Sequence, residues 1–415
     1  MKKVLSILLS VAMIVLCFAA CGKTDGDKSS TGKAANVKVG FIFLHDENST
    51  YDKNFITAAE EACKKAGVEI LKKTNISETQ ACYDAAAELV DEGCNVIFAD
   101  SFGHEPYVIQ AAKKFPEVQF LHATGTKAHT EGLSNYHNAF ASIYEGRYLA
   151  GVAAGMKLNE MISSGKITAD KAKMGYVGAY TYAEVISGYT SFYLGAKSVC
   201  PSVTMEVTFT GSWYDETAEK EAAQKLINNG CVLISQHADS MGAPTACEAA
   251  GVPNVSYNGS TVSACPNTFI VSSRIDWAPY LEYAIDCVKN GKAIDTDWTG
   301  TLSTGSVVLT DVNTKAAAEG TQAKIDEVKA ELESGKLHVF DTSAFTVTVS
   351  DSKNKNATVA ADGHLTGYKA DIDSDADNTG DTEVVSDGYF HESEKRSAPC
   401  FDVQIDGITL LDTKF

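Results

Sequence analysis

Two side chains suited to ligand binding follow a mostly apolar run near the middle of the chain. Residues 231–235 read CVLIS, and the next segment, QHADS, contains His237 and Asp239. Such a run is typical of a strand buried in a parallel sheet, and open α/β sheets bind ligands at the carboxyl ends of their strands. Imidazole and carboxylate groups also suit zinc, but two ligands do not make a metal site, so we expect neither a metal nor a cofactor.

Aromatic and polar side chains follow other strand-like segments in the same way. Phe55, Phe102 and Trp213 offer flat apolar faces, and Ser101 and Asn258 offer further hydrogen-bonding groups. A flat, uncharged, heteroaromatic ligand needs both kinds of group, because stacking provides contact area and fixed polar groups provide orientation. These residues therefore join the candidate binding site. The structural alternative is that Phe55 belongs to the core and that Trp213 covers the surface of a lobe.

A helix followed by a strand, within Gly211–Ser240, positions the central pair of polar side chains. Asp215 can cap the helix and Gly230 can end it. A similar arrangement occurs in Ser77–Ser101, where a capped helix, an apolar strand and a polar loop follow one another. Two such units predict two similar α/β lobes, each with a doubly wound sheet, and a cleft lined by both polar loops. The alternative, that any two βα units look alike at this level, stays open.

The remaining pattern predicts four parts. Beyond about residue 345, apolar and polar residues alternate and Gly and Asp occur in clusters. This pattern indicates a small β-rich appendage. The expected parts are a signal peptide over 1–20, a flexible tether over 21–36, a two-lobed domain over 37–344 and a β-rich extension over 345–415. Lobe 1 is expected to comprise about 37–157 and 277–300, and lobe 2 about 172–272 and 301–340.

The amino-terminal segment has the layout of a bacterial lipoprotein signal. Lys2 and Lys3 precede an apolar run that ends at Phe18, and Ala19-Ala20-Cys21 follows. The run is too short for a comfortable membrane span. Lipidation of Cys21 would anchor the protein at the extracytoplasmic face of the cell membrane, whereas a plain secreted protein is the alternative.

The lipid anchor can be tested by one substitution. We expect Cys21→Ala to leave the protein unlipidated and released from the membrane, because the acylated side chain is lost. Membrane fractionation with carbonate washing measures this, and retention of the variant would contradict the prediction.

The charge balance argues against a nucleic-acid partner. The chain has 35 Lys and Arg against 54 Asp and Glu, a formal net charge of −19, and removal of Lys2 and Lys3 brings it to −21. Such a surface repels phosphate backbones. No GxSxG, HExxH, GxGxxG or Walker loop occurs, so we expect no enzymatic activity.

Two further patterns have a structural interpretation and not a functional one. Of the 11 cysteines, nine remain after Cys17 and Cys21, and they form no CxxC pair. We expect most of them to be small buried side chains rather than a disulfide framework. The acidic stretch 370–383 approaches calcium-loop spacing, but Ala376 stands where such a loop needs glycine, so we expect a solvated loop.

Several short segments together resemble a known family. They are YDKNF (51–55), ADSFG (99–103), FLHATG (120–125), YEGRYLAGVAAG (144–155), GSWYD (211–215), QHADS (236–240) and RIDWAPY (274–280). In combination they resemble the basic membrane protein family, the purine-nucleoside-receptor-like solute-binding lipoproteins of ABC importers. The resemblance covers about Val37 to Phe340 and leaves the β-rich tail outside.

The resemblance implies a type I periplasmic-binding fold with a purine or nucleoside ligand and ABC permease subunits as partners. It implies that an aromatic at the position of Phe55 stacks on the purine. The same resemblance places four other candidates in binding loops: Ser101, Trp213, His237 and Asp239. Nucleoside-binding members carry an aspartate near Leu44-His45 and another where this chain has Asn258. We therefore expect a purine base to bind at least as well as its nucleoside. The alternative function is that of a sensor or an adhesin with the same fold.

Overall fold

The computed structural model describes residues 36–374 and 380–413. The expected signal peptide and Cys21 lie outside these residues, as does the expected tether apart from Asn36. Within the described ranges, no helix is both long and apolar enough to cross a membrane.

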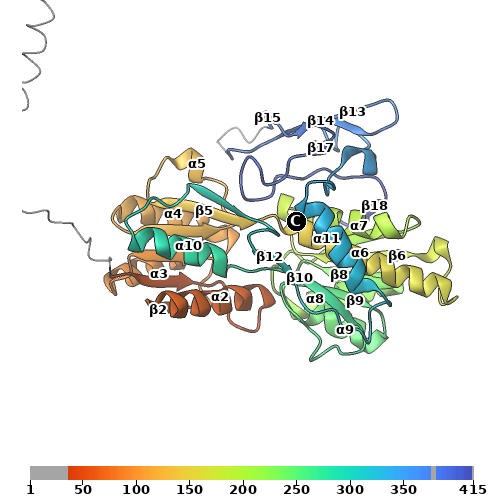
Figure 1. Cartoon of the computed structure of the whole chain (residues 1–415), viewed down its shortest axis with the longest axis horizontal. Coiled ribbons are helices and arrows are strands. Elements are labelled where there is room, and N and C mark those ends of the chain that lie inside the picture. Colours follow the sequence, from red (N-terminus) through yellow and green to blue (C-terminus); the bar gives the residue numbers. More distant parts are fainter. Residues whose placement is uncertain (1–35, 375–379, 414–415) are drawn as a thin grey trace, which may run out of the picture. The chain divides into compact units, whose positions relative to one another are not determined.

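Lobe 1 is built on a six-stranded parallel sheet with the order β11-β5-β4-β3-β1-β2. In Figure 1 this lobe carries the labels α2, α3, α4, α5 and α10. Its strands are β1 (Lys38–Ile42), β2 (Glu69–Lys73), β3 (Val96–Ala99), β4 (Gln119–Ala123), β5 (Tyr136–Ala141) and β11 (Asp297–Gly300). Its helices are α2 (Thr50–Ala66), α3 (Gln80–Asp91), the 3₁₀ turn η1 (Phe102–His104), α4 (Glu105–Lys114), α5 (Ala128–Glu131) and α10 (Ala278–Lys289). Phe98 packs in the core with α2 and α10, whereas its neighbour Ile97 packs with α3 and α4. Helices therefore cover both faces of the sheet.

Lobe 2 repeats this plan on a seven-stranded sheet with the order β12-β10-β9-β8-β6-β7-β18. Its strands are β6 (Lys173–Gly178), β7 (Thr204–Phe209), β8 (Leu233–Gln236), β9 (Asn254–Tyr257), β10 (Phe269–Ile275), β12 (Val307–Leu309) and β18 (Ile408–Leu410). Its helices are α6 (Ile143–Ser163), η2 (Ala169–Lys171), α7 (Ala183–Val199), α8 (Glu216–Asn228), α9 (Gly242–Ala250) and α11 (Thr321–Glu333). Because α6 packs on α7, β10 and β12, residues 143–157 belong to lobe 2 and not, as expected, to lobe 1. β12 runs antiparallel to β10, and the other pairings are parallel. The orders β2-β1-β3-β4-β5 and β7-β6-β8-β9-β10 are doubly wound, so the predicted α/β fold class is confirmed.

The helix and the strand that position His237 and Asp239 form for the local reasons that the sequence indicates. Asp215 is the N-cap of α8 and accepts a hydrogen bond from the backbone N–H of Ala218 at 2.9 Å. Gly230 follows the helix with φ +87°, a left-handed conformation that glycine adopts without steric cost. Thr79 caps α3 in the matching unit of lobe 1. The two units are therefore structural counterparts.

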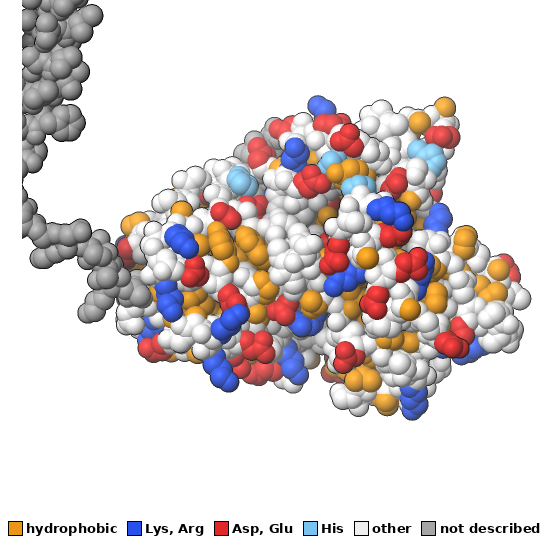
Figure 2. All heavy atoms as spheres, in the orientation of Figure 1, with side chains coloured by type: hydrophobic (Ala, Val, Ile, Leu, Met, Phe, Trp, Pro, Cys, Tyr) orange, Lys and Arg blue, Asp and Glu red, His pale blue; other side chains and the backbone are white. Residues whose placement is uncertain are grey.

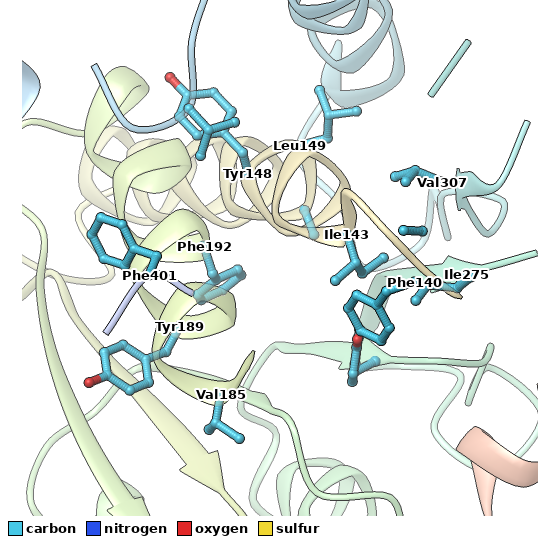
Figure 3. Packing of buried hydrophobic residues seen from close by; sticks show 14 of the residues in the cluster. Phe140, Ile143, Tyr148, Leu149, Val185, Tyr189, Phe192, Ile275, Val307 and Phe401 are labelled. Atoms are coloured by element: carbon cyan, nitrogen blue, oxygen red, sulfur yellow. The ribbon is translucent and has the colours of Figure 1, made fainter. Parts of the chain in front are cut away.

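The small-residue helix α6 packs closely, but its main neighbour is another helix. A Cβ atom on Gly151 would lie 2.0 Å from the carbonyl oxygen of Phe192 in α7, and one on Gly195 of α7 would lie 2.0 Å from that of Tyr148. Only Gly146 faces the sheet, beside Val307 and Ser273. Gly151 and Gly155 thus make room for α7, whereas Gly146 makes room for the sheet. Figure 3 shows the apolar side chains around this helix pair.

The segment after residue 340 contains η3 (Thr342–Ala344) and a set of short strands. These are β13 (Ala357–Val359), β14 (Leu365–Ala370), β15 (Thr382–Glu383), β16 (Val385–Ser386) and β17 (Tyr389–Phe390). β18 then joins the edge of the lobe 2 sheet beside β7. On the lobe 1 side, the backbone N–H of Ser397 donates to Asp297 Oδ2 at 2.8 Å. The β-rich extension thus contacts both lobes, which the sequence did not indicate.

The burial of the cysteines agrees with what the sequence predicts. The nine cysteines after Cys21 are all buried and free. Burial raises the pKa of Cys63 to about 12 and that of Cys94 to about 11, so these thiols behave as small apolar side chains. On the face seen in Figure 2, acidic and basic side chains are interspersed. Across the part of the chain that the structure describes, no group of three His, Cys, Asp or Glu side chains is placed to hold a metal ion.

Candidate ligand-binding site

A cavity lies between the carboxyl ends of the strands of both sheets. Six of the seven predicted ligand-binding residues line it, namely Ser101, Phe102, Trp213, His237, Asp239 and Asn258. Its other lining residues are Leu44, His45, Tyr51, Asp52, Thr124, Glu184 and Tyr257. Together they surround about 370 Å³ of space that no atom of the chain fills, the mouth included. The site therefore draws on loops after β1, β3 and β4 of lobe 1 and after β6, β7, β8 and β9 of lobe 2.

The structure does not bring Phe55 to this cavity. Its side chain is 1% exposed and stacks on Trp277 in the core, with ring centroids 4.3 Å apart and an interplanar angle of 22°. Tyr51 lies one helical turn earlier, at the cavity, with its ring 4.9 Å from that of Phe55. Residues four apart share a helix face, so the sequence identified the correct face of α2 but the wrong turn. Tyr51, and not Phe55, is therefore the aromatic side chain of α2 that lines the cavity.

Ser101 lines the cavity, but its hydroxyl is used to hold the loop. Ser101 Oγ donates to Glu78 Oε1 at 2.6 Å, and the backbone N–H of Gly103 donates to the same oxygen at 2.7 Å. Any side chain at Gly103 would overlap Glu78, since a Cβ there would lie 2.5 Å from its carboxyl carbon. Glu78 thereby fixes the loop that presents Phe102.

Asp52 is an ionised carboxylate in the first turn of α2. Its Oδ1 accepts a hydrogen bond from the backbone N–H of His45 at 2.7 Å, and its Oδ2 lies 3.3 Å from His45 Nδ1. Burial by itself would raise the pKa of Asp52, but hydrogen bonds from His45 and Ser49 outweigh it and lower that pKa. Behind it, burial and the charge of Asp52 raise the pKa of Asp100 well above its ordinary value. Asp52 thus supplies the ionised carboxyl group of the lobe 1 wall, whereas burial favours the neutral form of Asp100.

Asp239 links the two lobes and faces the cavity. Its backbone oxygen accepts hydrogen bonds from Thr50 N at 3.2 Å and from Thr50 Oγ1 at 3.1 Å, and its Oδ1 accepts from Asn258 Nδ2 at 3.2 Å. Burial, and then the charge of Asp52, raise the pKa of Asp239 well above its ordinary value. Asn258 adopts φ +62°, which asparagine tolerates better than most residues. The Asn258 amide therefore orients the carboxyl group of Asp239.

Trp213 and Phe102 line the cavity, and Tyr180 and Tyr182 lie beside them. Trp213 lies 5.1 Å from Tyr180 and 6.0 Å from Tyr182, between ring centroids. Phe102 of lobe 1 is 38% exposed and lies 5.3 Å from Tyr182 of lobe 2, so an aromatic contact crosses between the lobes. The alternative that Trp213 merely covers a lobe surface does not describe this position, because the indole lines the cavity.

Thr124 is a lining residue with a strained backbone. Its φ is +66°, which is unusual for a β-branched side chain. Its Oγ1 is buried and has no hydrogen-bond partner within the described part of the chain. Such strain persists where the surrounding structure imposes it and is found preferentially at binding sites. The Thr124 hydroxyl is thus free to bond a ligand.

Of four cavity residues that the sequence did not indicate, three share a recognisable position. Tyr51 and Asp52 begin the helix after β1, Glu184 begins the helix after β6, and Tyr257 ends β9. The first helical turn after a strand therefore contains three of these four residues. His45 and Thr124 also follow strand ends, but nothing in their local sequence marks them as ligand contacts.

The cavity suits a flat ligand without negative charge. Among the residues that the structure describes, its lining includes no lysine or arginine, whereas it includes Asp52, Glu184 and Asp239. A phosphate group would meet Asp52 and Glu184 without a lysine or arginine to offset their charge. Rings and hydrogen-bonding groups together provide what a neutral heteroaromatic molecule requires.

Comparison with known proteins assigns the family. The chain matches the family described as Bmp, ABC transporter substrate-binding protein PnrA-like, over residues 41–336. It is 30% identical over 310 residues to a purine-binding protein of Brucella abortus, which covers 73% of this chain and 83% of that relative. It is 27% identical over 332 residues to a putative ABC transporter glucose-binding protein of Haloferax volcanii, with 78% of each chain covered. A nucleoside-binding protein, BmpA of Lactococcus lactis, is 24% identical over 256 residues, covering 60% of this chain and 68% of BmpA.

Solved structures share the fold. An ABC transporter solute-binding protein from Conexibacter woesei superposes with a TM-score of 0.59 at 21% identity, covering 73% of this chain and 98% of that one. Another, from Aeropyrum pernix, superposes with a TM-score of 0.61 at 17% identity, covering 76% of this chain and 94% of that one. The architecture is thus that of a two-lobed periplasmic solute-binding protein, as the resemblance implied. The chain belongs to the Bmp family of PnrA-like substrate-binding proteins of ABC transporters.

Proposed function

We propose that this protein captures a purine base or purine nucleoside between its two lobes. The captured molecule is passed to the permease subunits of an ABC importer, and a lipid on Cys21 keeps the protein at the extracytoplasmic face of the membrane. The observation that supports this most is the composition of the cavity, in which aromatic rings and hydrogen-bonding side chains from both lobes converge without a lysine or arginine among the described residues. The purine-binding relative adds weight to the same ligand class.

Within this class we expect a base to bind at least as well as its nucleoside. Asn258, which stands where nucleoside-binding members carry an aspartate, uses its amide to hold Asp239. Leu44 and His45, the other departure from the pattern, also line the cavity. Two groups expected to hold ribose hydroxyls are therefore absent from those positions.

Calorimetry with a defined panel tests the ligand class. The panel contains adenine, guanine, hypoxanthine, their nucleosides, adenosine monophosphate and glucose. We expect at least one purine to bind and the monophosphate to fail, because its phosphate would face Asp52 and Glu184. Tight glucose binding without response to any purine would refute the purine assignment and favour the activity named for the Haloferax relative. A clear preference for nucleosides would refute only the preference for the base.

Ligand binding is expected to stabilise the form in which the lobes touch. Thr50 of lobe 1 bonds Asp239 of lobe 2, and Asn54 Nδ2 donates to Ile275 O at 2.6 Å. A ligand that contacts both walls adds to these contacts and shifts an open–closed equilibrium toward closure. The bound protein should therefore be more compact in small-angle scattering and should unfold at a higher temperature. Scattering profiles that superimpose with and without saturating ligand would contradict this.

A further inference from the structure

Arg147 is a buried guanidinium that lies beneath the lobe 2 wall of the cavity. It belongs to α6 and is fully buried. It donates to Ser256 O, Ser273 Oγ, Tyr176 OH, Ser235 Oγ and Gln236 O, at distances of 2.8 to 3.5 Å. The rings of Tyr176, Phe192 and Tyr257 surround it, with centroids 5.1 to 5.4 Å from its central carbon. None of these partners is a carboxylate.

A chain of hydrogen bonds leads from this guanidinium to the cavity. Arg147 Nη2 lies 3.2 Å from Tyr176 OH, which lies 3.3 Å from His237 Nδ1. On the other side of the imidazole, His237 Nε2 lies 3.4 Å from Glu184 Oε1. His237 and Glu184 both line the cavity, whereas Arg147 and Tyr176 do not.

Arg147 sets the direction of these hydrogen bonds. A guanidinium has donors and no acceptor, so the Tyr176 oxygen must accept from Arg147. Tyr176 is fully buried, and the partner left for its own hydrogen is His237 Nδ1. A hydrogen on Nδ1 would leave the Tyr176 O–H buried without an acceptor, which costs free energy. On the neutral ring the hydrogen therefore belongs on Nε2, where the carboxylate of Glu184 accepts it.

We propose that Arg147 and Tyr176 are positioning residues that hold His237 as the Nε2–H tautomer, so that its ring has a donor, and no acceptor, on the side of the cavity. Without ligand this hydrogen faces Glu184 Oε1 at 3.4 Å, so an acceptor of the captured molecule, such as a ring nitrogen or a carbonyl oxygen, must replace Glu184 as its partner. Glu184 is then left to accept from an N–H of the same ligand edge. The statement about the ligand rests on the proposed function, whereas the tautomer is a property of the protein alone.

The fold also keeps the imidazole in place. Gly188 of α7 lies directly against the ring, since a Cβ there would be 2.8 Å from His237 Nδ1 and 3.4 Å from Tyr176 OH. The ring also lies 4.7 Å from that of Tyr257, between centroids. The glycine makes room for Nδ1 to reach the tyrosine hydroxyl, and the ring cannot shift without losing that contact.

The test is a side-chain nitrogen NMR spectrum of the ligand-free protein labelled with ¹⁵N-histidine. His237→Gln assigns the signal. We expect the His237 ring to carry its hydrogen on Nε2 and none on Nδ1, and we expect Tyr176→Phe to abolish this preference. A wild-type ring with hydrogen on Nδ1, or on both nitrogens, would overturn the proposal, as would an unchanged spectrum in Tyr176→Phe. The wild-type spectrum decides the tautomer even if the variant fails to fold.

Tyr189→Phe is the matched control. Tyr189 is also a buried tyrosine of lobe 2, its ring lies 5.9 Å from that of Tyr176, and its hydroxyl has no partner among the described residues. With adenine as probe, we expect Tyr176→Phe to weaken binding at least fivefold and Tyr189→Phe to change it less than twofold. Equal losses in both variants would overturn the assigned role of Tyr176. If wild-type protein takes no purine, the proposed function fails while the spectrum still decides the tautomer.

Discussion

Replacing Gly151 by alanine is expected to cost roughly 2–3 kcal/mol of unfolding free energy, because the new methyl group would overlap the backbone of a neighbouring helix. The Cβ would lie 2.0 Å from Phe192 O and 3.0 Å from Ala196 N, and neither atom can move without displacing α7. Alanine favours an isolated helix over glycine by about 1 kcal/mol. Helix propensity therefore predicts stabilisation, whereas the observed packing predicts the opposite sign.

Denaturant unfolding followed by circular dichroism measures this difference. Gly259→Ala is the control, since its Cβ would meet Thr50 at 3.6 Å, an ordinary contact, and its φ is not left-handed. We expect the control to unfold at nearly the wild-type midpoint. If Gly151→Ala were as stable as the control, the close approach of α6 and α7 would be contradicted.

The parts of the fold that could be predicted are those with local signals. Asp215 before α8 and Thr79 before α3 act as caps within their own segments, and the apolar run before Gln236 is a central strand. β2 escaped prediction because its sequence, EILKK, carries charges on an edge strand, where Lys72 and Lys73 pair with carboxylates outside the sheet. Its strand conformation depends on pairing with β1, which is distant in sequence.

The same distinction explains the site. Polar residues directly after strands, such as His237 and Asp239, could be found because strand ends in a doubly wound sheet converge. Phe55 and Tyr51 share a helix face, and only the depth at which α2 docks on its sheet decides which of the two rings reaches the cavity. The path from Arg147 to His237 joins α6, β6 and the loop after β8, and no local pattern encodes contacts between elements so far apart in sequence.

Trp213→Ala is expected to weaken binding of the tightest purine in the panel by roughly 5- to 150-fold. Stacking of a base on an aromatic side chain contributes about 1–3 kcal/mol, and 1.4 kcal/mol corresponds to about a tenfold change in affinity. Trp213 lines the cavity with only part of its surface buried by its neighbours, so a ligand can cover the remainder. His237→Ala and Asp239→Ala should cost a comparable amount, because each would leave a polar atom of the buried ligand unpaired.

Trp298→Ala separates loss of stacking from loss of a large side chain. Trp298 is also partly buried and packs 5.1 Å from Tyr280, between ring centroids, but it does not line the cavity. We expect this variant to lose stability and to keep its affinity, whereas Trp213→Phe should retain most of the binding that Trp213→Ala loses. Phe55→Ala should resemble Trp298→Ala, since Phe55 is buried against Trp277. Calorimetry on the four variants decides this, and unchanged affinity in Trp213→Ala would remove the indole from the binding site.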